Sequence, residues 1–447
     1  MHFTSKTVAH VVLICLMYYF LWLGIFRNLG MQLTFLFIWA IITVSPGVEL
    51  PTLIYSEHKT PSLYLKRIVS GVQKLSKYVP TWWILDRHFQ TIIPDLLRQH
   101  NIHQVTIPPV KYNREILNTD DGGTLALDFV VTQRSNINDL SSLQTSSSSS
   151  SSSAAAAAAA VNEKKNKLLS QTVIILYPGI TGGSDAKYIQ EVVTMLQSAY
   201  PHSNFLNIVC LNQRGINCPL TSPKLSNGAY TMDFHLIIQY LLERKNYKYF
   251  IGIGYSMGSN LLLKYLGEQG SKMSGVCFGA ISISNPLDFL KASHRLGTFF
   301  SRNVYSRMLC KSALKVIDRN SDLFKKVECI DYDDVMLSER LVHLDERFTR
   351  KLGGYETLEA YLVDASSSRW IENIAVPTMI INARNDPFVD PSVLHRYENE
   401  NVVLVVTENG GHLGFPEGSN PLKLQNWTHG VVVEFVQSVL TNNLHNA

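Results

Sequence analysis

The sequence predicts an α/β fold with a mostly parallel central sheet and helices on both faces. From Thr172 onward, short apolar stretches alternate with helical ones, which is typical of βαβ units. One apolar stretch, Tyr249–Gly254, runs directly into a glycine-flanked serine and then into a helical run. At 447 residues, 46% of them hydrophobic, the chain is long enough to build one large domain of this class.

The N-terminal part of the chain is unusually apolar. Residues 1–54 carry only three charged side chains, which are Lys6, Arg27 and Glu49. Val11–Phe26 is a run without a charge, and a second apolar stretch, Leu33–Val44, follows it. About 20 apolar residues span a bilayer as one helix. We therefore expect residues 1–54 to form an N-terminal transmembrane anchor, as one pass or a hairpin; a cleaved signal peptide and a buried helix hairpin are the alternatives.

Between this segment and the strand–helix pattern lie two weaker signals. Residues 55–113 have aromatic and basic residues with little periodicity, and we expect them to form an approach segment that lies on the domain. The domain is expected to cover residues 114–447, beginning with a hairpin of Arg114–Leu117 and Thr124–Val131 around an Asp-Gly turn. Runs of serine and alanine indicate a flexible low-complexity insertion at 132–168, in which the alanines can form a short helix.

The remaining elements follow from the apolar pattern. Strands are expected at Thr172–Tyr177, Asn207–Leu211, Tyr249–Gly254, Val276–Ser284, Thr378–Ala383 and Val402–Glu408. Helices are expected at Lys187–Tyr200, Met232–Lys245, Asn260–Gly267, Pro391–Glu400 and Trp427–Thr441. Residues 286–370 exceed the length of one crossover, so we expect a helical insertion above the sheet after the sixth strand.

Charge and cysteine content exclude several classes of protein. The chain has 40 Lys and Arg and 36 Asp and Glu, a net charge of +4, which is far from the concentrated basic surface of a nucleic-acid-binding protein. The six cysteines form no C-x-x-C pair, so nothing in their spacing indicates a zinc site or a disulfide framework. We expect no nucleic-acid partner, no metal and no cofactor.

The segment Gly254-Tyr255-Ser256-Met257-Gly258 carries the main chemical signal. A G-x-S-x-G sequence between a strand and a helix is typical of a nucleophile elbow, in which a tight turn exposes the serine and the glycines allow strand and helix to approach closely. Ser256 is therefore the candidate nucleophile. An ordinary glycine-rich turn is the alternative interpretation.

A serine nucleophile needs a base, and the base needs an orienting acid. In this type of fold the chain order is Ser, then Asp or Glu, then His. Asp386 follows the strand Thr378–Ala383, with Asp390 as the alternative acid. His412 lies in a glycine-rich loop after the last strand, and it is the candidate base.

Two other histidines are poorer candidates because they fall within expected helices: His395 and His429. An acyl-transfer site also needs hydrogen-bond donors for an oxyanion. The loop Tyr177–Gly183 follows the first parallel strand, and the backbone N–H groups of Ile180 and Met257 are the expected pair. A phosphate-binding loop is the alternative for this segment, although it lacks the G-x-x-x-x-G-K-[ST] pattern.

With these motifs in hand, the chain resembles membrane-anchored α/β-hydrolases. This group includes mammalian abhydrolase domain-containing proteins of types 1, 2, 3 and 15, yeast medium-chain fatty acid ethyl ester synthases and plant embryogenesis-associated hydrolases. The resemblance rests on HFQTIIP, PGITGGS, NQRGINCP, GYSMGSN, SNPLDF, INARNDPFV and GGHLGFPEG in this order. The chain departs from the group at Gln213, where a histidine is usual, and at Asn385, where an acid is common.

The resemblance implies an α/β-hydrolase fold, an N-terminal anchor and activity on carboxylic esters of lipids, which include phospholipids, acylglycerols and fatty acyl esters. We expect a serine hydrolase with lipid esters and a membrane as its partners, at the endoplasmic reticulum or another endomembrane, with the plasma membrane as the alternative. Transfer of the acyl group to an alcohol and a catalytically silent binding protein are the competing functions.

Overall fold

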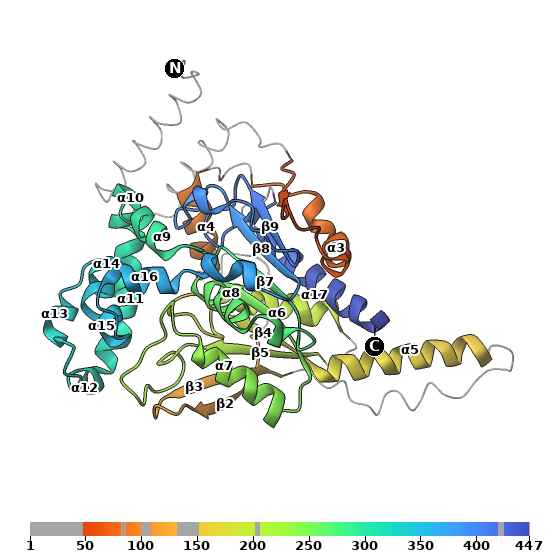
Figure 1. Ribbon diagram of the computed structural model, residues 1–447, viewed down its shortest axis with the longest axis horizontal. Helices are drawn as coiled ribbons and strands as arrows, with labels where there is room; N and C mark the ends of the chain where they lie inside the picture. Colours follow the sequence, from red (N-terminus) through yellow and green to blue (C-terminus); the bar gives the residue numbers. More distant parts are fainter. Residues whose placement is uncertain are drawn as a thin grey trace, which may run out of the picture.

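The computed structural model describes residues 48–81, 84, 86–99, 109–131, 152–201, 206–418 and 424–446. Within these ranges a nine-stranded sheet has the order β1-β9-β8-β7-β6-β4-β5-β3-β2 (Figure 1). Its strands are β1 (Thr52–Ile54), β2 (Tyr112–Asn118), β3 (Thr124–Val130), β4 (Thr172–Tyr177), β5 (Asn207–Asn212), β6 (Tyr249–Tyr255), β7 (Cys277–Ile283), β8 (Thr378–Ala383) and β9 (Val402–Thr407). Strands β10 (Pro416–Glu417) and β11 (Gln425–Asn426) form a small separate pair.

The predicted mostly parallel sheet is confirmed. Strands β5, β4, β6, β7, β8 and β9 are parallel to one another. The hairpin β2–β3 adds to one edge in antiparallel register, and β1 adds to the other edge against β9. The carboxyl ends of the parallel strands therefore all point to the same end of the sheet, where the loops that follow β4, β6, β8 and β9 can meet.

Helices cover both faces of the sheet, as the apolar strands require. In β4, Ile174 and Leu176 belong to one hydrophobic cluster, whereas Val173 and Ile175 belong to the other. The first cluster packs against α3 (Leu63–Ser70), α6 (Lys187–Ala199) and α17 (Trp427–Asn446), and the second against α7 (Met232–Gln239) and α8 (Met257–Gln269). Short turns extend this framework: η1 (Gln73–Ser76), η3 (Tyr240–Arg244) and η4 (Gly270–Met273).

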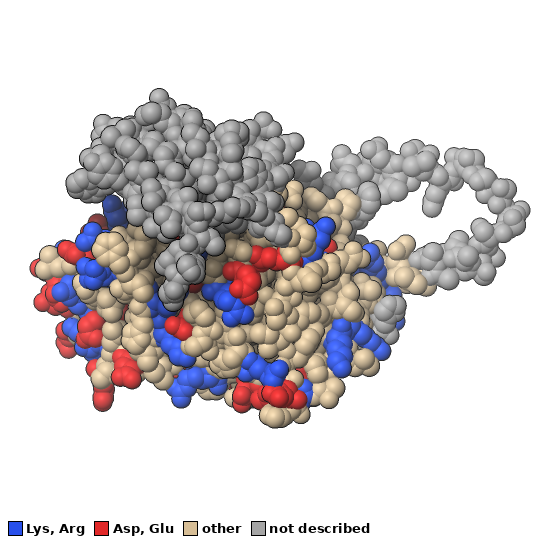
Figure 2. Space-filling model, turned by 90° about the horizontal axis from the view of Figure 1, so that it is seen from above, with Lys and Arg blue, Asp and Glu red and all other residues tan. Residues whose placement is uncertain are grey.

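The chain between β7 and β8 forms the expected helical insertion, which we call the cap. Its elements are α9 (Phe289–Leu296), α10 (Phe299–Asn303), α11 (Tyr305–Arg319), α12 (Ser321–Phe324), α13 (Tyr332–Met336), α14 (Leu341–Leu344), η5 (Asp345–Thr349), α15 (Arg350–Leu352), α16 (Leu358–Ala365) and η6 (Ser367–Asn373). The cap has its own apolar cluster around Phe324 and Phe348. Figure 2 shows mixed acidic and basic side chains over this end of the molecule.

The structure differs from the sequence prediction in two helices. The segment expected as helix Pro391–Glu400 forms only the short turn η7 (Pro391–Val393), which Asp390 caps. No helical hydrogen bonds continue beyond this turn. Conversely, a helix continues through the alanine run and beyond it, as α5 (Ser152–Gln171). Alanine is the strongest helix former, and Leu168 and Leu169 bury the end of α5 against the domain.

The approach segment is more ordered than its periodicity indicates. Helix α3 packs on α17 through Leu65 and Ile68. Helix α4 (Arg87–Gln99) begins at Asp86, whose carboxylate accepts the N–H groups of His88 and Phe89 at 2.9 and 3.3 Å. Helix α4 lies near the ends of the parallel strands, where it contacts the loop that follows β9 (Figure 1).

Most of the predicted anchor, residues 1–47, lies outside the described residues, and it stays a prediction. Its last residues do not belong to such a segment, because Thr52–Ile54 form β1 and pair with β9. Glu49 forms an isolated bridge with Tyr78. No helix in the described ranges is long and apolar enough to cross a bilayer.

Candidate active site

The candidate nucleophile occupies a strained turn between β6 and α8. Ser256 has φ +50° and ψ −118°, a backbone conformation that non-glycine residues rarely adopt. Its N–H donates to the carbonyl of Ile283 at 2.9 Å, and its carbonyl accepts the N–H of Asn260 at 3.1 Å. These two bonds connect the turn to β7 and to α8, so that the surrounding structure maintains the strained conformation.

Both flanking glycines are required by close packing. A Cβ atom at Gly254 would lie 2.4 Å from the Cα of Ser259, and one at Gly258 would lie 2.3 Å from the carbonyl oxygens of Tyr177 and Pro178. Real Cβ atoms do not approach backbone this closely, so only glycine permits strand β6, helix α8 and the loop after β4 to converge here.

The structure brings the three predicted site residues together. His412 Nε2 lies 2.9 Å from Ser256 Oγ, and His412 Nδ1 lies 2.9 Å from Asp386 Oδ2. Asp386 is fully buried, and its other oxygen accepts the N–H of Phe388 at 2.8 Å. The Phe388 ring stacks on the imidazole with 4.1 Å between centroids. The carboxylate therefore contacts one imidazole nitrogen while the other faces the serine.

The alternative site residues lie elsewhere. Asp390 accepts the N–H of Ser392 at 2.9 Å, and hydrogen bonds from Ser392 hold the pKa of this carboxyl below its usual range. His395 is exposed, outside a helix, and contacts the carbonyl of Ser392 at 2.9 Å. His429 is buried in α17, 3.4 Å from Glu191. Burial holds the pKa of His429 well below its usual range, and none of the three contacts Ser256.

The two expected backbone donors belong to the two segments that meet at Ser256, helix α8 and the loop after β4. Met257 is the first residue of α8, and Ile180 lies in the loop after β4. Both residues line the same cavity as Ser256. Neither N–H has a hydrogen-bond acceptor among the described residues, so both can donate to a substrate oxygen.

The loop that contains Ile180 is held by side chains on both sides. The N–H of Gly179 donates to the Tyr188 hydroxyl at 3.0 Å, and the N–H of Thr181 donates to Gln213 Oε1 at 3.1 Å. Gln213 Nε2 in turn donates to the carbonyl of Gly179 at 2.8 Å. The glutamine that replaces the histidine usual in similar sequences thus forms two hydrogen bonds that position this loop.

Sequence reasoning missed the contribution of α4 to the histidine loop. Gln90 is fully buried, and its Oε1 accepts the N–H of Gly410 and an amide hydrogen of Asn385, both at 2.8 Å. Its Nε2 donates to the carbonyl of Ile84 at 2.9 Å. The adjacent Thr91 hydroxyl accepts the N–H of His412 at 2.9 Å.

Two further side chains complete this network. Asn385 Oδ1 accepts the N–H of Gly411 at 3.0 Å, and Glu49 accepts hydrogen bonds from both the backbone and the side chain of Asn409. Three successive N–H groups, those of residues 410–412, are therefore fixed by Gln90, Asn385 and Thr91. The only sequence signal for these contacts is the HFQTIIP segment itself. It is one of the motifs by which the chain resembles α/β-hydrolases, but the sequence alone indicated no role for it.

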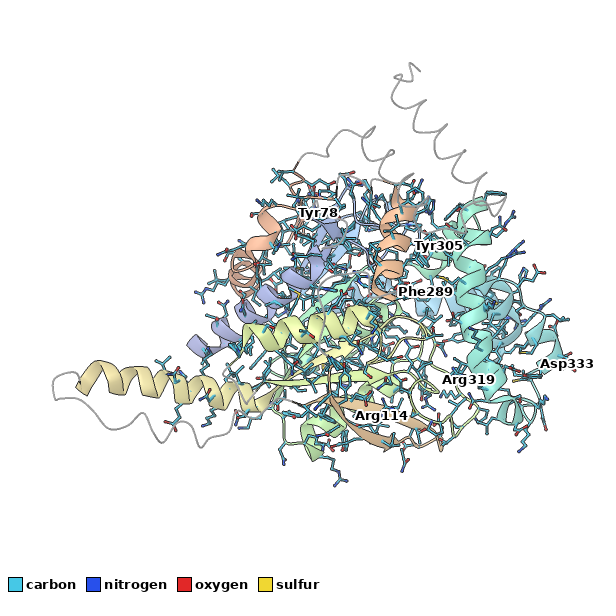
Figure 3. The ribbon with its side chains drawn as sticks, turned by 180° about the vertical axis from the view of Figure 1, so that it is seen from behind. Tyr78, Arg114, Phe289, Tyr305, Arg319 and Asp333 are labelled. Carbon is cyan, nitrogen blue, oxygen red and sulfur yellow. The ribbon has the colours of Figure 1, made fainter. Side chains whose placement is uncertain are left out.

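The site opens into a cavity of about 940 Å³. Its apolar wall comes from α4, the cap and the loop after β8, with Ile92, Leu96, Leu296, Leu309 and Phe388. Figure 3 labels Tyr305, at the start of the cap helix α11, and Phe289, at the start of α9; both line this cavity. The volume is within the range of sites for small organic ligands.

Comparison with known proteins agrees with this architecture. The family model described as the alpha/beta hydrolase fold matches residues 172–419. Among similar proteins, the embryogenesis-associated protein EMB8 of Picea glauca is 27% identical over 368 residues, which cover 80% of this chain and 72% of that protein. Phospholipase ABHD3 of Mus musculus is 28% identical over 369 residues, with 81% and 79% covered. Monoacylglycerol lipase ABHD2 of Homo sapiens is 29% identical over 290 residues, with 60% and 65% covered.

The Gln90 network predicts a specific defect. Gln90→Leu leaves the N–H of Gly410 buried without an acceptor and removes the shorter of the two hydrogen bonds of the Asn385 amide. The histidine loop should therefore shift, and reaction of Ser256 with a fluorophosphonate probe should slow about tenfold or more. The rate constant of labelling, measured beside thermal unfolding, checks this. Arg87→Gln, at an exposed position of the same helix, is the matched control, and equal labelling rates in the two variants would contradict the prediction.

Proposed function

This chain belongs to the family of proteins with the α/β-hydrolase fold, and we propose that it is a serine hydrolase that cleaves carboxylic esters of lipids. The observation that carries the proposal is the hydrogen-bonded series Ser256–His412–Asp386 in the wall of a large, mainly apolar cavity. This arrangement matches in geometry the units that activate a serine for acyl transfer.

In the proposed reaction, His412 Nε2 accepts the proton of Ser256 Oγ as the oxygen attacks the ester carbonyl. Asp386 holds the N–H tautomer at Nδ1 and stabilises the imidazolium that forms. His412 then donates its proton to the alcohol leaving group, which leaves an acyl group on Ser256. Water, deprotonated by His412, attacks the acyl-enzyme; the bond from the acyl carbon to Ser256 Oγ breaks, His412 returns the proton to Oγ, and the carboxylic acid is released.

The negative charge that develops on the carbonyl oxygen needs fixed donors. The N–H groups of Ile180 and Met257 are proposed for this role, because neither has an acceptor among the described residues and both residues line the cavity that contains Ser256. Such donors stabilise the transition state more than the ground state, since they are oriented before the reaction begins. Gln213 and Tyr188 support this role by holding the residues on both sides of Ile180.

Two observations favour a lipid as the substrate. The cavity wall near Ser256 is lined by aliphatic and aromatic side chains suited to an acyl chain. Two of the similar proteins are named as a phospholipase and a monoacylglycerol lipase. A lipid ester is concentrated in a bilayer, and we include in the proposal that the apolar residues 1–47 hold the protein at a membrane.

Removing the nucleophile tests the central assignment. Ser256→Ala should lower ester hydrolysis about a thousandfold or more and abolish fluorophosphonate labelling, because the covalent step is lost. Turnover of a short soluble ester by purified protein measures this. Ser198→Ala, which removes an exposed hydroxyl that bonds only within α6, is the control; a labelled Ser256→Ala protein would mean that another residue is the nucleophile.

A second comparison distinguishes the two candidate acids, Asp386 and Asp390. Asp386→Asn should lower kcat about a thousandfold without unfolding the protein, because it removes the acceptor that fixes the His412 tautomer. Asp390→Asn should stay within about twofold, since that carboxylate caps an exposed turn. Measured kcat values in the opposite order would assign the role to Asp390.

A pair of truncations separates membrane attachment from catalysis. Deleting residues 1–47 should release the protein from membranes, while turnover of a soluble ester stays within about twofold, because the described site contacts all begin at Glu49 or later. Deleting residues 1–54 also removes Glu49 and β1, and should slow the same reaction several-fold more. Membrane fractionation and soluble-ester assays measure both. Extraction of the intact protein by high salt or carbonate would refute the anchor.

A further inference from the structure

The cap contributes two arginines to the cavity wall that form no ion pair with any residue the structure describes. Arg302 lies in α10 and Arg340 directly precedes α14, and both line the cavity that contains Ser256. The Nε atom of each is buried and has no hydrogen-bond acceptor among the described residues. The ion pairs within the cap instead use three other arginines, which are Arg307, Arg347 and Arg350.

Neither acidic side chain that lines this cavity forms an ion pair with Arg302 or Arg340. Asp95 and Asp345 line the same cavity. Asp95 accepts a hydrogen bond from Gln99 of its own helix at 2.7 Å, and burial raises its pKa. Burial also raises the pKa of Asp345, to about 7, so that it is only partly ionised at neutral pH. All other Asp and Glu side chains except Asp139 belong to the described residues, so the comparison of acids with these arginines leaves out only that one.

The other basic side chains that line the cavity either pair with an acid or are exposed to solvent. Arg98 pairs with Glu191 at 3.1 Å, and His412 with Asp386. His294 is exposed. A guanidinium that is partly withdrawn from water without an anionic partner is unfavourable, whereas two guanidinium groups on one wall can bind a phosphate through paired N–H donors.

The arginines line the same cavity as the reacting groups, and a chain of packed rings connects their part of the cap to His412. The ring of Phe388 stacks on His412, and the ring of Tyr305 packs on Phe388 with 5.0 Å between centroids. Arg302 precedes Tyr305 by three residues. The N–H of Leu341 donates to the hydroxyl of Ser306 at 3.0 Å, which brings the residue before it, Arg340, to the same part of the cap.

We propose that Arg302 and Arg340 form an anion subsite of the catalytic cavity, which binds the phosphate group of a lipid ester whose acyl carbonyl lies at Ser256. The inference rests on the proposed function and adds a substrate preference to it. An ester that carries a phosphate on the alcohol side gains two charged contacts, whereas a neutral acylglycerol leaves both arginines without an anion. The protein therefore selects phosphate-bearing esters.

Two soluble esters with the same acyl chain test the preference without a bilayer: 1-butanoylglycerol and 1-butanoylglycerol 3-phosphate. The wild-type full chain should have the higher kcat/KM for the phosphate ester. Arg302→Gln and Arg340→Gln should each lower that value about tenfold, mainly through KM, and lower the value for the neutral ester much less. Arg302→Lys should recover part of the loss, because it restores the charge.

The matched control is Arg307→Gln. Arg307 is an exposed arginine of the same part of the cap, it pairs with Glu339 at 3.5 Å, and it does not line the cavity. It should change neither ester's kinetics beyond about twofold. If both esters are cleaved equally well, and the cavity arginines affect them equally, the anion subsite is refuted while the hydrolase function stands.

Binding without turnover separates the remaining outcomes. Hexyl phosphate and inorganic phosphate are titrated calorimetrically into the Ser256→Ala protein and into the same protein with Arg302→Gln. The subsite is supported if hexyl phosphate binds more tightly than inorganic phosphate and if Arg302→Gln weakens its affinity about tenfold. This holds even if the wild type cleaves neither ester, because the lack of cleavage would reject only the proposed function. Equal affinity for inorganic phosphate would show a free-anion site, and no binding of either would overturn the proposal.

Discussion

The 2.9 Å contact between Ser256 Oγ and His412 Nε2 is the interaction on which the arrangement of the site depends. It joins two loops that are 156 residues apart in the chain. The parallel sheet makes this possible, because β6 and β9 end at the same edge and place both loops there. The strained turn at Ser256 then directs its hydroxyl out of the sheet toward the imidazole, and the cost of that turn is offset by the packing around it.

A hydrogen bond of this length also needs the histidine loop to stay in place, and the sheet alone does not achieve this. The loop after β9 is rich in glycine, so its backbone has little conformational preference of its own. Helix α4 supplies Gln90 and Thr91, which accept the N–H groups of Gly410 and His412. The site therefore includes a segment that lies outside residues 172–419, the range that matches the family model. Catalysis and the approach segment are physically connected through these buried hydrogen bonds.

Local patterns predicted the parts of the site that depend on local geometry. The glycines around Ser256 indicate a tight turn, and the positions of Asp386 and His412 after strands follow from the order of the elements. The contacts of Gln90 could not be predicted in this way, since its partners lie about 300 residues further on and no periodicity relates them. The three residues of β1 were missed for the same reason: their strand character comes from pairing with β9 rather than from their own sequence.

The cavity combines two walls that are built under different constraints. The wall at the sheet edge has to hold Ser256, His412 and two backbone donors to within a few tenths of an ångström, and glycines and buried amides there permit little change. The apolar cluster of the cap around Phe324 and Phe348, which also includes Leu220 from the loop after β5, is separate from the two clusters that pack on the sheet, so the surface of the cap toward the cavity can vary without disturbing the strand ends. An arginine without a partner is costly to keep beside an apolar cavity, and the cap is the part of the molecule where such a residue can contact substrate while the reacting groups stay fixed. Selection of the substrate and activation of the serine are thus assigned to different elements, which contact each other where Tyr305 of the cap packs on Phe388.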